Sequence, residues 1–125
     1  MDRIDMQINL SRVEFSELKT KEKGESSAAI RERVVKARLL QQERLEALGM
    51  HCNAQMGRSE VVKYCQLDAA AQNVMERYFN MLNLSARSHD RILKVARTIA
   101  DLAGSENIEA VHLAEAIQLR TSVRP

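Results

Sequence analysis

Apolar residues between positions 84 and 104 recur at the three- and four-residue steps of one helix face. Ser85 is a favourable N-cap and Gly104 is a favourable stop, so the pattern predicts a helix between them. The expected buried face contains Ile92, Val95, Ala96, Ile99, Leu102 and Ala103. We expect this amphipathic helix to be the element around which the rest of the chain packs.

Basic residues lie on the opposite side of this predicted helix. At about 100° per residue, Arg87, Arg91 and Lys94 fall together. Arg87 lies in the first turn, where the helix dipole repels cations. Either an anion joins Arg87 at the free N–H groups of the helix start, or Arg87 is a solvated surface residue. The residues alone leave both interpretations open.

The same apolar spacing predicts four further helices, at residues 27–48, 59–65, 69–82 and 110–120. Ser26 or Ser27 would cap the first of them, and Asp68 would cap the third. Gly49 and Asn83 follow two of these segments and can take the left-handed conformation that ends a helix. Residues 50–57 are expected to form a loop.

The apolar residues of these segments indicate which faces are buried. In the first helix the stripe is interrupted at Gln41, and the charged residues around it, Arg44 among them, are expected on a solvated outer face. Its apolar positions are Ile30, Val34, Ala37, Leu45 and Leu48. The later stripes are Ala71, Val74, Met75, Tyr78, Phe79 and Leu82, then Leu113, Ala114 and Ile117.

The first ten residues have a different pattern. Ile4, Met6, Ile8 and Leu10 alternate with polar residues, which is typical of a strand with one buried face. A lone strand is not stable by itself, so we expect the chain to be a fragment whose other strands are missing. Residues 11–26 form a polar linker and residues 121–125 a short tail. The predicted fold is therefore an all-α helical bundle over residues 27–120, preceded by an orphan strand and a linker.

Composition narrows the class of protein. A chain of 125 residues is enough for one domain, and its net charge of +2 is too small to indicate a nucleic-acid or membrane surface. There is neither an apolar run near 18 residues nor a signal peptide, so we expect a cytoplasmic protein without a membrane partner. Aromatic residues are few, which predicts an aliphatic core.

The sequence shows no complete active site. Cys52 follows His51, but no second close pair of ligands accompanies them, so Cys52 and Cys65 are expected to be reduced structural thiols and no metal site is predicted. His89 beside Asp90 is more typical of a surface than of a catalytic base. The sequence contains neither GxxxxGK[ST] nor HExxH.

Arg3 is the remaining candidate, because arginine forks onto phosphate oxygens and stabilises charge in phosphoryl transfer. It precedes the orphan strand, whereas Arg87 opens the central helix, and two arginines on different elements suit a nucleotide site completed by several pieces. The alternative is that Arg3 pairs with Asp2 or Asp5 at the surface.

Five stretches carry a family resemblance: DRID, GESSAAIRERVVKAR, NAQM, KYCQLD and, above all, LSARSHDRILKVARTIADLAG. Over nearly the whole chain they resemble the C-terminal part of the magnesium-chelatase-like AAA+ ATPases. Within this family they look like a competence-related branch, a member of which is described as a DNA branch-migration helicase. The chain departs from the family motif at Met1, where the family has leucine.

The resemblance implies roles that the residues alone do not. Residues 1–10 would be the end of the AAA+ core and residues 27–120 the C-terminal helical lid. Arg3 would be the arginine finger that reaches the neighbouring subunit's ATP, and Arg87 the sensor-2 arginine on its own subunit's γ-phosphate. The full-length protein would use ATP and Mg²⁺, assemble into a homo-oligomeric ring and process DNA.

This chain lacks the Walker A and Walker B motifs, so we expect it to bind no cofactor tightly and to be inactive alone. The alternative is a stand-alone helical module that binds nucleic acid or protein. It would use Arg87, Arg91 and Lys94 together with the basic residues between 31 and 44. The small net charge and the shortage of stacking aromatic residues argue against nucleic acid.

Overall fold

The computed structural model describes Met6 and residues 26–121 of the chain. The described part contains five α-helices: α2 (Ser27–Leu45), α3 (Arg58–Tyr64), α4 (Ala69–Met81), α5 (Ala86–Leu102) and α6 (Ala110–Thr121). Two short 3₁₀ turns, η1 (Glu46–Leu48) and η2 (Asn53–Gln55), join α2 to α3. No strand occurs among these residues, where Leu67 and Ile108 form an isolated parallel bridge. The predicted all-α bundle is confirmed.

The predicted strand and linker lie outside the described residues, except for Met6 and Ser26. The predicted tail after residue 121 lies outside them as well.

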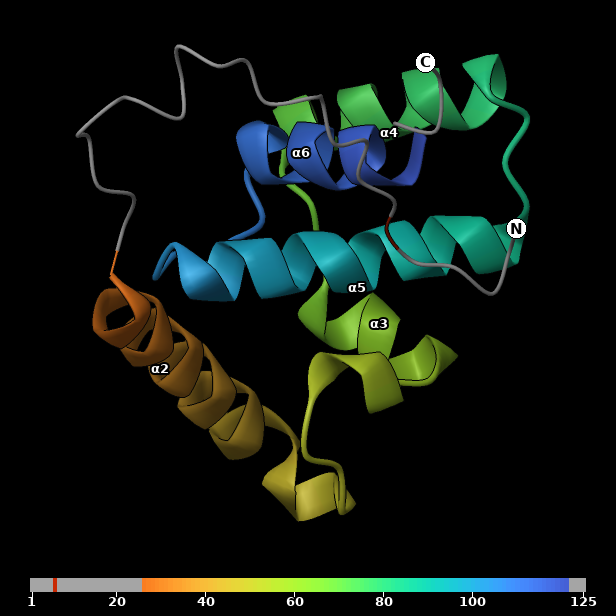
Figure 1. Ribbon diagram of the computed structural model, residues 1–125. Helices are drawn as coiled ribbons and strands as arrows, with labels where there is room; N and C mark the ends of the chain where they lie inside the picture. Colours follow the sequence, from red (N-terminus) through yellow and green to blue (C-terminus); the bar gives the residue numbers. More distant parts are fainter. Residues whose placement is uncertain (1–5, 7–25, 122–125) are drawn as a thin grey trace, which may run out of the picture.

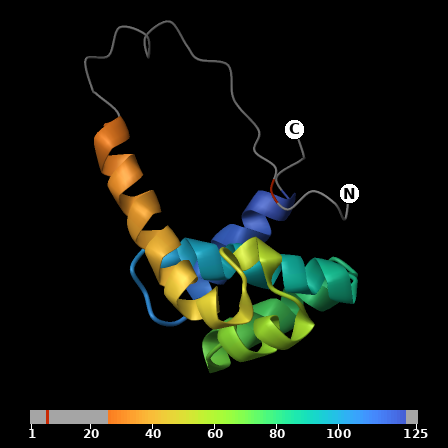
Figure 2. The same cartoon turned by 90° about the horizontal axis from the view of Figure 1, so that it is seen from below.

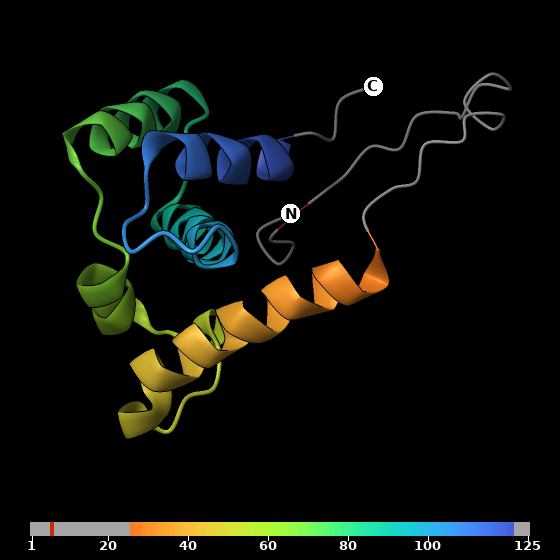
Figure 3. The same ribbon diagram turned by 90° about the vertical axis from the view of Figure 1, so that its left-hand side faces the viewer.

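Helix α5 is the centre of the bundle (Figure 1). It contacts α6 on one side and α2 and α3 on the other, while α4 packs on α6. Figure 3 looks nearly along α5 and shows α6 above it and α2 below. The prediction that the other helices pack around residues 84–104 is thus confirmed for α2, α3 and α6.

The helix ends follow the local signals in the sequence. The hydroxyl of Ser26 accepts the Ala29 N–H at 3.1 Å, Asp68 Oδ1 accepts the Ala71 N–H at 2.8 Å, and Ser85 Oγ accepts the Ser88 N–H at 3.1 Å. These contacts satisfy amide donors that the first turn of a helix leaves unpaired. The predicted stops are also observed, with positive φ at Gly49, Asn83 and Gly104.

The buried core is mainly aliphatic, as expected. Its largest fully buried apolar side chains are Leu45, Val61, Met75, Ile92, Ile108 and Leu113. Several predicted stripe positions were wrong, because the buried faces are rotated toward neighbouring helices. In α4, α5 and α6 and at their ends, the predicted positions that are exposed are Leu82, Leu102, Ala103 and Ala114. Leu93, Ala100, His112 and Ala116 are buried in addition.

Helix α2 differs most from its predicted stripe. Only Ala37, Gln41 and Leu45 are buried, at four-residue steps, while Ile30 and Val34 are exposed. Gln41 does not interrupt the contact, because its Oε1 accepts the buried Asn53 N–H at 2.9 Å. The start of α2 extends away from the other helices in two views (Figures 2 and 3). Leu48, the last predicted stripe position, is also exposed and lies in η1.

Candidate functional site

Arg87 lies in the first turn of α5, one residue after Ala86 opens the helix. Its side chain is exposed, on the side of the helix away from the core residues Ile92 and Ala96. The side of α5 on which the sequence places Arg87 is therefore confirmed.

A hollow of about 390 Å³ lies beside Arg87, between the start of α3 and one face of α5. Its lining residues are Met56, Gly57, Arg58, Val61, Arg87, Asp90, Arg91 and Lys94. Four of them are cations and one is a carboxylate. The three predicted basic residues of α5 therefore do lie together, and Arg58 joins them from another helix.

Arg58 is held toward α5 by Asp90. Its Nη1 donates to Asp90 Oδ1, and the same oxygen lies 3.1 Å from His89 Nδ1. The Asp90 side chain is only 20% exposed, compared with 65% for Arg58, so the carboxylate is the fixed partner of this ion pair. Sequence reasoning missed Arg58, because a single arginine at the start of a short helix carries no signal that it faces α5.

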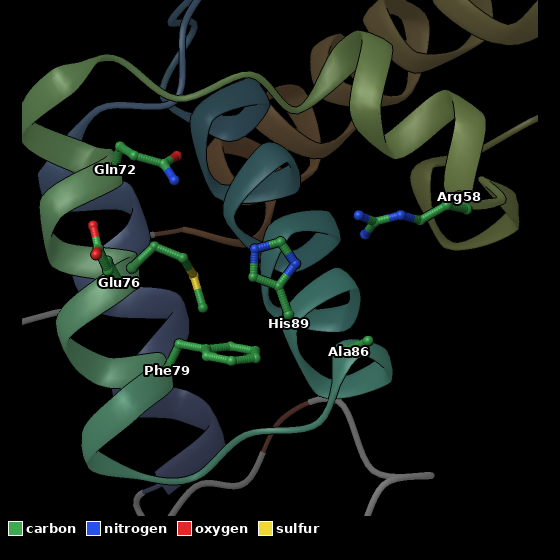
Figure 4. A pocket seen from close by; sticks show the side chains of 7 residues that line it. Arg58, Gln72, Glu76, Phe79, Ala86 and His89 are labelled. Atoms are coloured by element: carbon green, nitrogen blue, oxygen red, sulfur yellow. The ribbon is translucent and has the colours of Figure 1, made fainter.

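His89 packs between α5 and α4 rather than projecting freely. Its ring meets Phe79 edge-on, with the centroids 5.9 Å apart and the planes at 83°. Figure 4 shows His89 facing Phe79 on one side, with Arg58 pointing toward it on the other. This second hollow, of about 320 Å³, is lined by Arg58, Gln72, Met75, Glu76, Phe79, Ala86 and His89.

A buried polar cluster joins α2 to α5 at the opposite end of the bundle. The Asp101 carboxylate accepts Arg44 Nη2 at 2.8 Å, Arg44 Nη1 at 3.0 Å and Asn53 Nδ2 at 2.9 Å. Arg97 Nη2 lies 3.2 Å from the same carboxylate. The expectation that Arg44 lies on a solvated face was wrong, because its charge is neutralised by a residue 57 positions later in the chain.

The two arginines of this cluster are perturbed in opposite directions. The hydrogen bond to Asp101 raises the pKa of Arg44, whereas burial lowers the pKa of Arg97. Arg97 also donates to the carbonyls of Ser105 at 2.8 Å and Glu106 at 2.9 Å. Arg97 thereby fixes the turn after α5. Its Nε has no hydrogen-bond partner among the residues that the structure describes. The cluster as a whole links α2, η2 and α5 through hydrogen bonds to Asp101.

The remaining sequence candidates are Arg3, His51, Cys52 and Cys65. Arg3 lies outside the described residues. Within the described part of the chain, no three His, Cys, Asp or Glu side chains are arranged to hold a metal ion. Cys52 and Cys65 are free thiols, and burial raises the pKa of Cys65 to about 11. In the same residues, no helix is long and apolar enough to cross a membrane.

The helical bundle agrees with the C-terminal domain of the magnesium-chelatase type, which the comparison of sequences identifies. Residues 24–120 match the family described as magnesium chelatase, subunit ChlI C-terminal. Because that match covers most of the chain, the chain belongs to this family, and the family resemblance inferred from the sequence is confirmed.

Individual relatives point the same way. The chain is 40% identical over 125 residues to the competence protein ComM of Haemophilus influenzae, covering 99% of this chain and 24% of that protein. It is 41% identical over 98 residues to the uncharacterized protein YifB of Salmonella typhimurium, covering 78% of this chain and 19% of the relative. For YifB of Escherichia coli the identity is 37% over 121 residues, 96% of this chain and 23% of the relative. The chain spans about a quarter of the length of these relatives or less.

Proposed function

We propose that this chain is the helical lid of a magnesium-chelatase-like AAA+ ATPase and that Arg87 senses the γ-phosphate of ATP. The observation that carries the proposal is the position of Arg87, exposed in the first turn of the central helix beside a hollow lined by three further cations. A cation is unfavourable at a helix start unless an anion joins it. Membership of the magnesium chelatase C-terminal family supports the same role.

The bundle suits transmission of nucleotide state. Arg87 is part of α5, and α5 contacts three other helices, so a pull on the first turn moves the whole domain. In this proposal Arg87 makes lid closure depend on the γ-phosphate. Arg3, as the finger toward the neighbouring subunit, couples closure to the next position in a homo-oligomeric ring. ATP and Mg²⁺ are then substrates of the full-length protein rather than ligands of this domain alone.

The biological role of the full-length protein is proposed from one of its named relatives. The Haemophilus influenzae protein is called a competence protein, and the family branch that the sequence resembles is described as moving DNA branches. We therefore propose DNA processing in the cytoplasm as the role of the whole protein.

Arg87→Ala in the full-length protein tests the lid proposal. ATP turnover should fall by about a hundredfold, on the scale of losing one electrostatic contact to developing charge, while the helical content and melting temperature stay unchanged. Arg77→Ala is the matched control, because Arg77 is an exposed arginine on α4 outside the hollow. Turnover at the control level in Arg87→Ala would remove Arg87 from the nucleotide site.

Arg3→Ala tests the finger. The variant should lose turnover but still bind ATP, because the finger acts on the neighbour's nucleotide. If the folded variant binds no ATP, the assignment of Arg3 fails.

The alternative is a stand-alone module that binds nucleic acid, and one of its proposed binding residues is engaged within the fold. Arg44 was part of the basic face that it would use, and Arg44 is instead paired with the buried Asp101. The module would show salt-dependent binding of a short duplex by this chain alone.

A further inference from the structure

We propose that Arg120, at the end of α6, positions Arg87 by holding the first turn of α5 from its buried side. The link between the two arginines is Ser88, which follows Arg87 in the chain and whose hydroxyl oxygen accepts Arg120 Nη2 at 2.9 Å. This inference rests on the proposed function, because Arg120 acts through the contact of Arg87 with the γ-phosphate. Arg120 is a positioning residue and does not itself contact the nucleotide.

The hydroxyl groups of Ser85 and Ser88 hold the start of α5 together. Ser85 Oγ, the N-cap, accepts the Ser88 N–H at 3.1 Å, and the Ser85 hydroxyl donates to Ser88 Oγ at 3.1 Å. Ser88 is buried, so these contacts lie on the inner side of the helix. Arg120 Nη2 joins them at the Ser88 oxygen. A residue 32 positions later in the chain is therefore part of the cap of α5.

The buried face of α6 places Arg120 beside this turn. Ala116 and Ile117 are buried, and Arg120 follows them at steps of four and three residues, which puts it on the same helix face. Helix α6 packs against α5, so this face is fixed relative to the central helix. The hydrogen bond from the Arg120 guanidinium is charge-assisted, and such bonds are stronger than those between neutral groups. The end of α6 thus restrains the first turn of α5.

Arg87 and Ser88 occupy different sides of the same turn. Successive residues are about 100° apart around a helix, and here Arg87 is exposed whereas Ser88 is buried. Helix ends fray, because the first amides of a helix lack intrahelical acceptors. A hydrogen bond that holds Ser88 on the inner side therefore also limits the positions that the exposed Arg87 can reach.

The size of the effect follows from the alignment of Arg87. If the first turn frays, Arg87 points at the γ-phosphate for a smaller fraction of the time, and turnover falls by that fraction. A small misplacement of a group that acts on the reacting centre can cost up to about a hundredfold in rate. We expect loss of the Arg120 hydrogen bond to lower turnover about tenfold, which is less than the loss expected for Arg87→Ala.

Steady-state ATP turnover of the full-length protein tests this link. Arg120→Gln and Ser88→Ala should each lower kcat about tenfold, because each removes the charge-assisted hydrogen bond between the two residues. Arg120→Lys should recover part of the loss, because lysine keeps a charged donor. Arg77→Gln is the matched control, since it removes the same charge from an exposed position on α4 and should leave kcat unchanged.

A double-mutant cycle separates positioning from general support of the fold. If Arg120 acts through Arg87, then adding Arg120→Gln to Arg87→Ala causes no further loss of kcat. Hydrogen exchange over residues 84–90 should be faster in Arg120→Gln than in the wild type, because the first turn frays more often. Thermal melting checks that each variant is folded, and Ser88→Ala serves in the same cycle if Arg120→Gln does not fold.

Three results would overturn the positioning role of Arg120. They are a kcat of Arg120→Gln equal to that of Arg77→Gln, the same loss of kcat with and without Arg87, and unchanged hydrogen exchange over residues 84–90. The lid proposal is judged separately, by the turnover of Arg87→Ala alone. If Arg87→Ala loses turnover but Arg120→Gln does not, the lid proposal stands and only the role of Arg120 is removed.

Discussion

Asp101→Asn is expected to destabilise the domain more than its small change in shape suggests. The substitution keeps the size of the side chain but removes the negative charge that two arginines share. The side chain of Asp101 is fully buried, and those of Arg44 and Arg97 are 15% and 5% exposed. Leaving buried cations without their counter-charge costs about 3–5 kcal/mol of unfolding free energy.

Most of the lost unfolding free energy should come from the unpaired charge of Arg44. Arg97 keeps its bonds to the Ser105 and Glu106 carbonyls, and Arg44 Nη1 keeps the Asn53 side chain at 3.0 Å. Arg44 Nη2 has Asp101 as its described partner. For a helical domain of this size the melting temperature should drop by about 12–40 °C.

Urea unfolding followed by circular dichroism measures the change. Glu32→Gln is the matched control, because it removes a carboxylate from the exposed pair with Lys36 at 3.5 Å and should cost less than about 0.5 kcal/mol. Adding Arg44→Met to Asp101→Asn should recover about 1 kcal/mol or more, since it removes the unpaired charge. A loss in Asp101→Asn no larger than that in the control would refute the reasoning.

Two further predictions concern the Cys65 thiol and the turn at Gly104. Because the folded pKa of Cys65 is raised to about 11 from 9.0, the folded state holds its proton more tightly, so stability is lost as pH rises from about 9 to 11. Urea unfolding at pH 7.5 and 10.5 should show a steeper decline for the wild type than for Cys65→Ala; parallel declines would contradict the assignment. Gly104→Ala should cost about 1 kcal/mol from its φ of +72° alone, because no atom of the described residues lies within 4 Å of the added Cβ. Gly104→Asn should cost less, and a thermal melt with the two variants ranked the other way would count against this explanation.

Local signals in the sequence predicted the helix ends well. Ser26, Asp68 and Ser85 cap their helices because a hydroxyl or carboxylate needs only the next three residues to find its N–H donor. Gly49, Asn83 and Gly104 end helices for an equally local reason, their tolerance of positive φ. Such features depend on neighbours in sequence, so one sequence is enough to find them.

Features that depend on distant partners were missed. Arg97 and Asp101 are charged and carry no local signal of burial, yet both are buried, where Asp101 pairs with Arg97 and with Arg44 of α2. The start of α2 shows the opposite error, because its apolar residues Ile30 and Val34 were predicted to be buried and are exposed. Part of the candidate site was predictable, since Arg87, Arg91 and Lys94 share a helix, but Arg58 reaches them only through the packing of α3 on α5.

The buried residues of α2 are confined to one half of the helix. Its buried contacts, Ala37, Gln41 and Leu45, all lie in its second half, and the Arg44–Asp101 ion pair fixes the same half to α5. The first residue, Ser27, is 14 positions before Gln41, which is about 21 Å along a helix. A tilt of about 10° at the anchored half would therefore move Ser27 by about 4 Å. A small rotation of α2 about the buried polar cluster would therefore displace its first residue more than its buried second half.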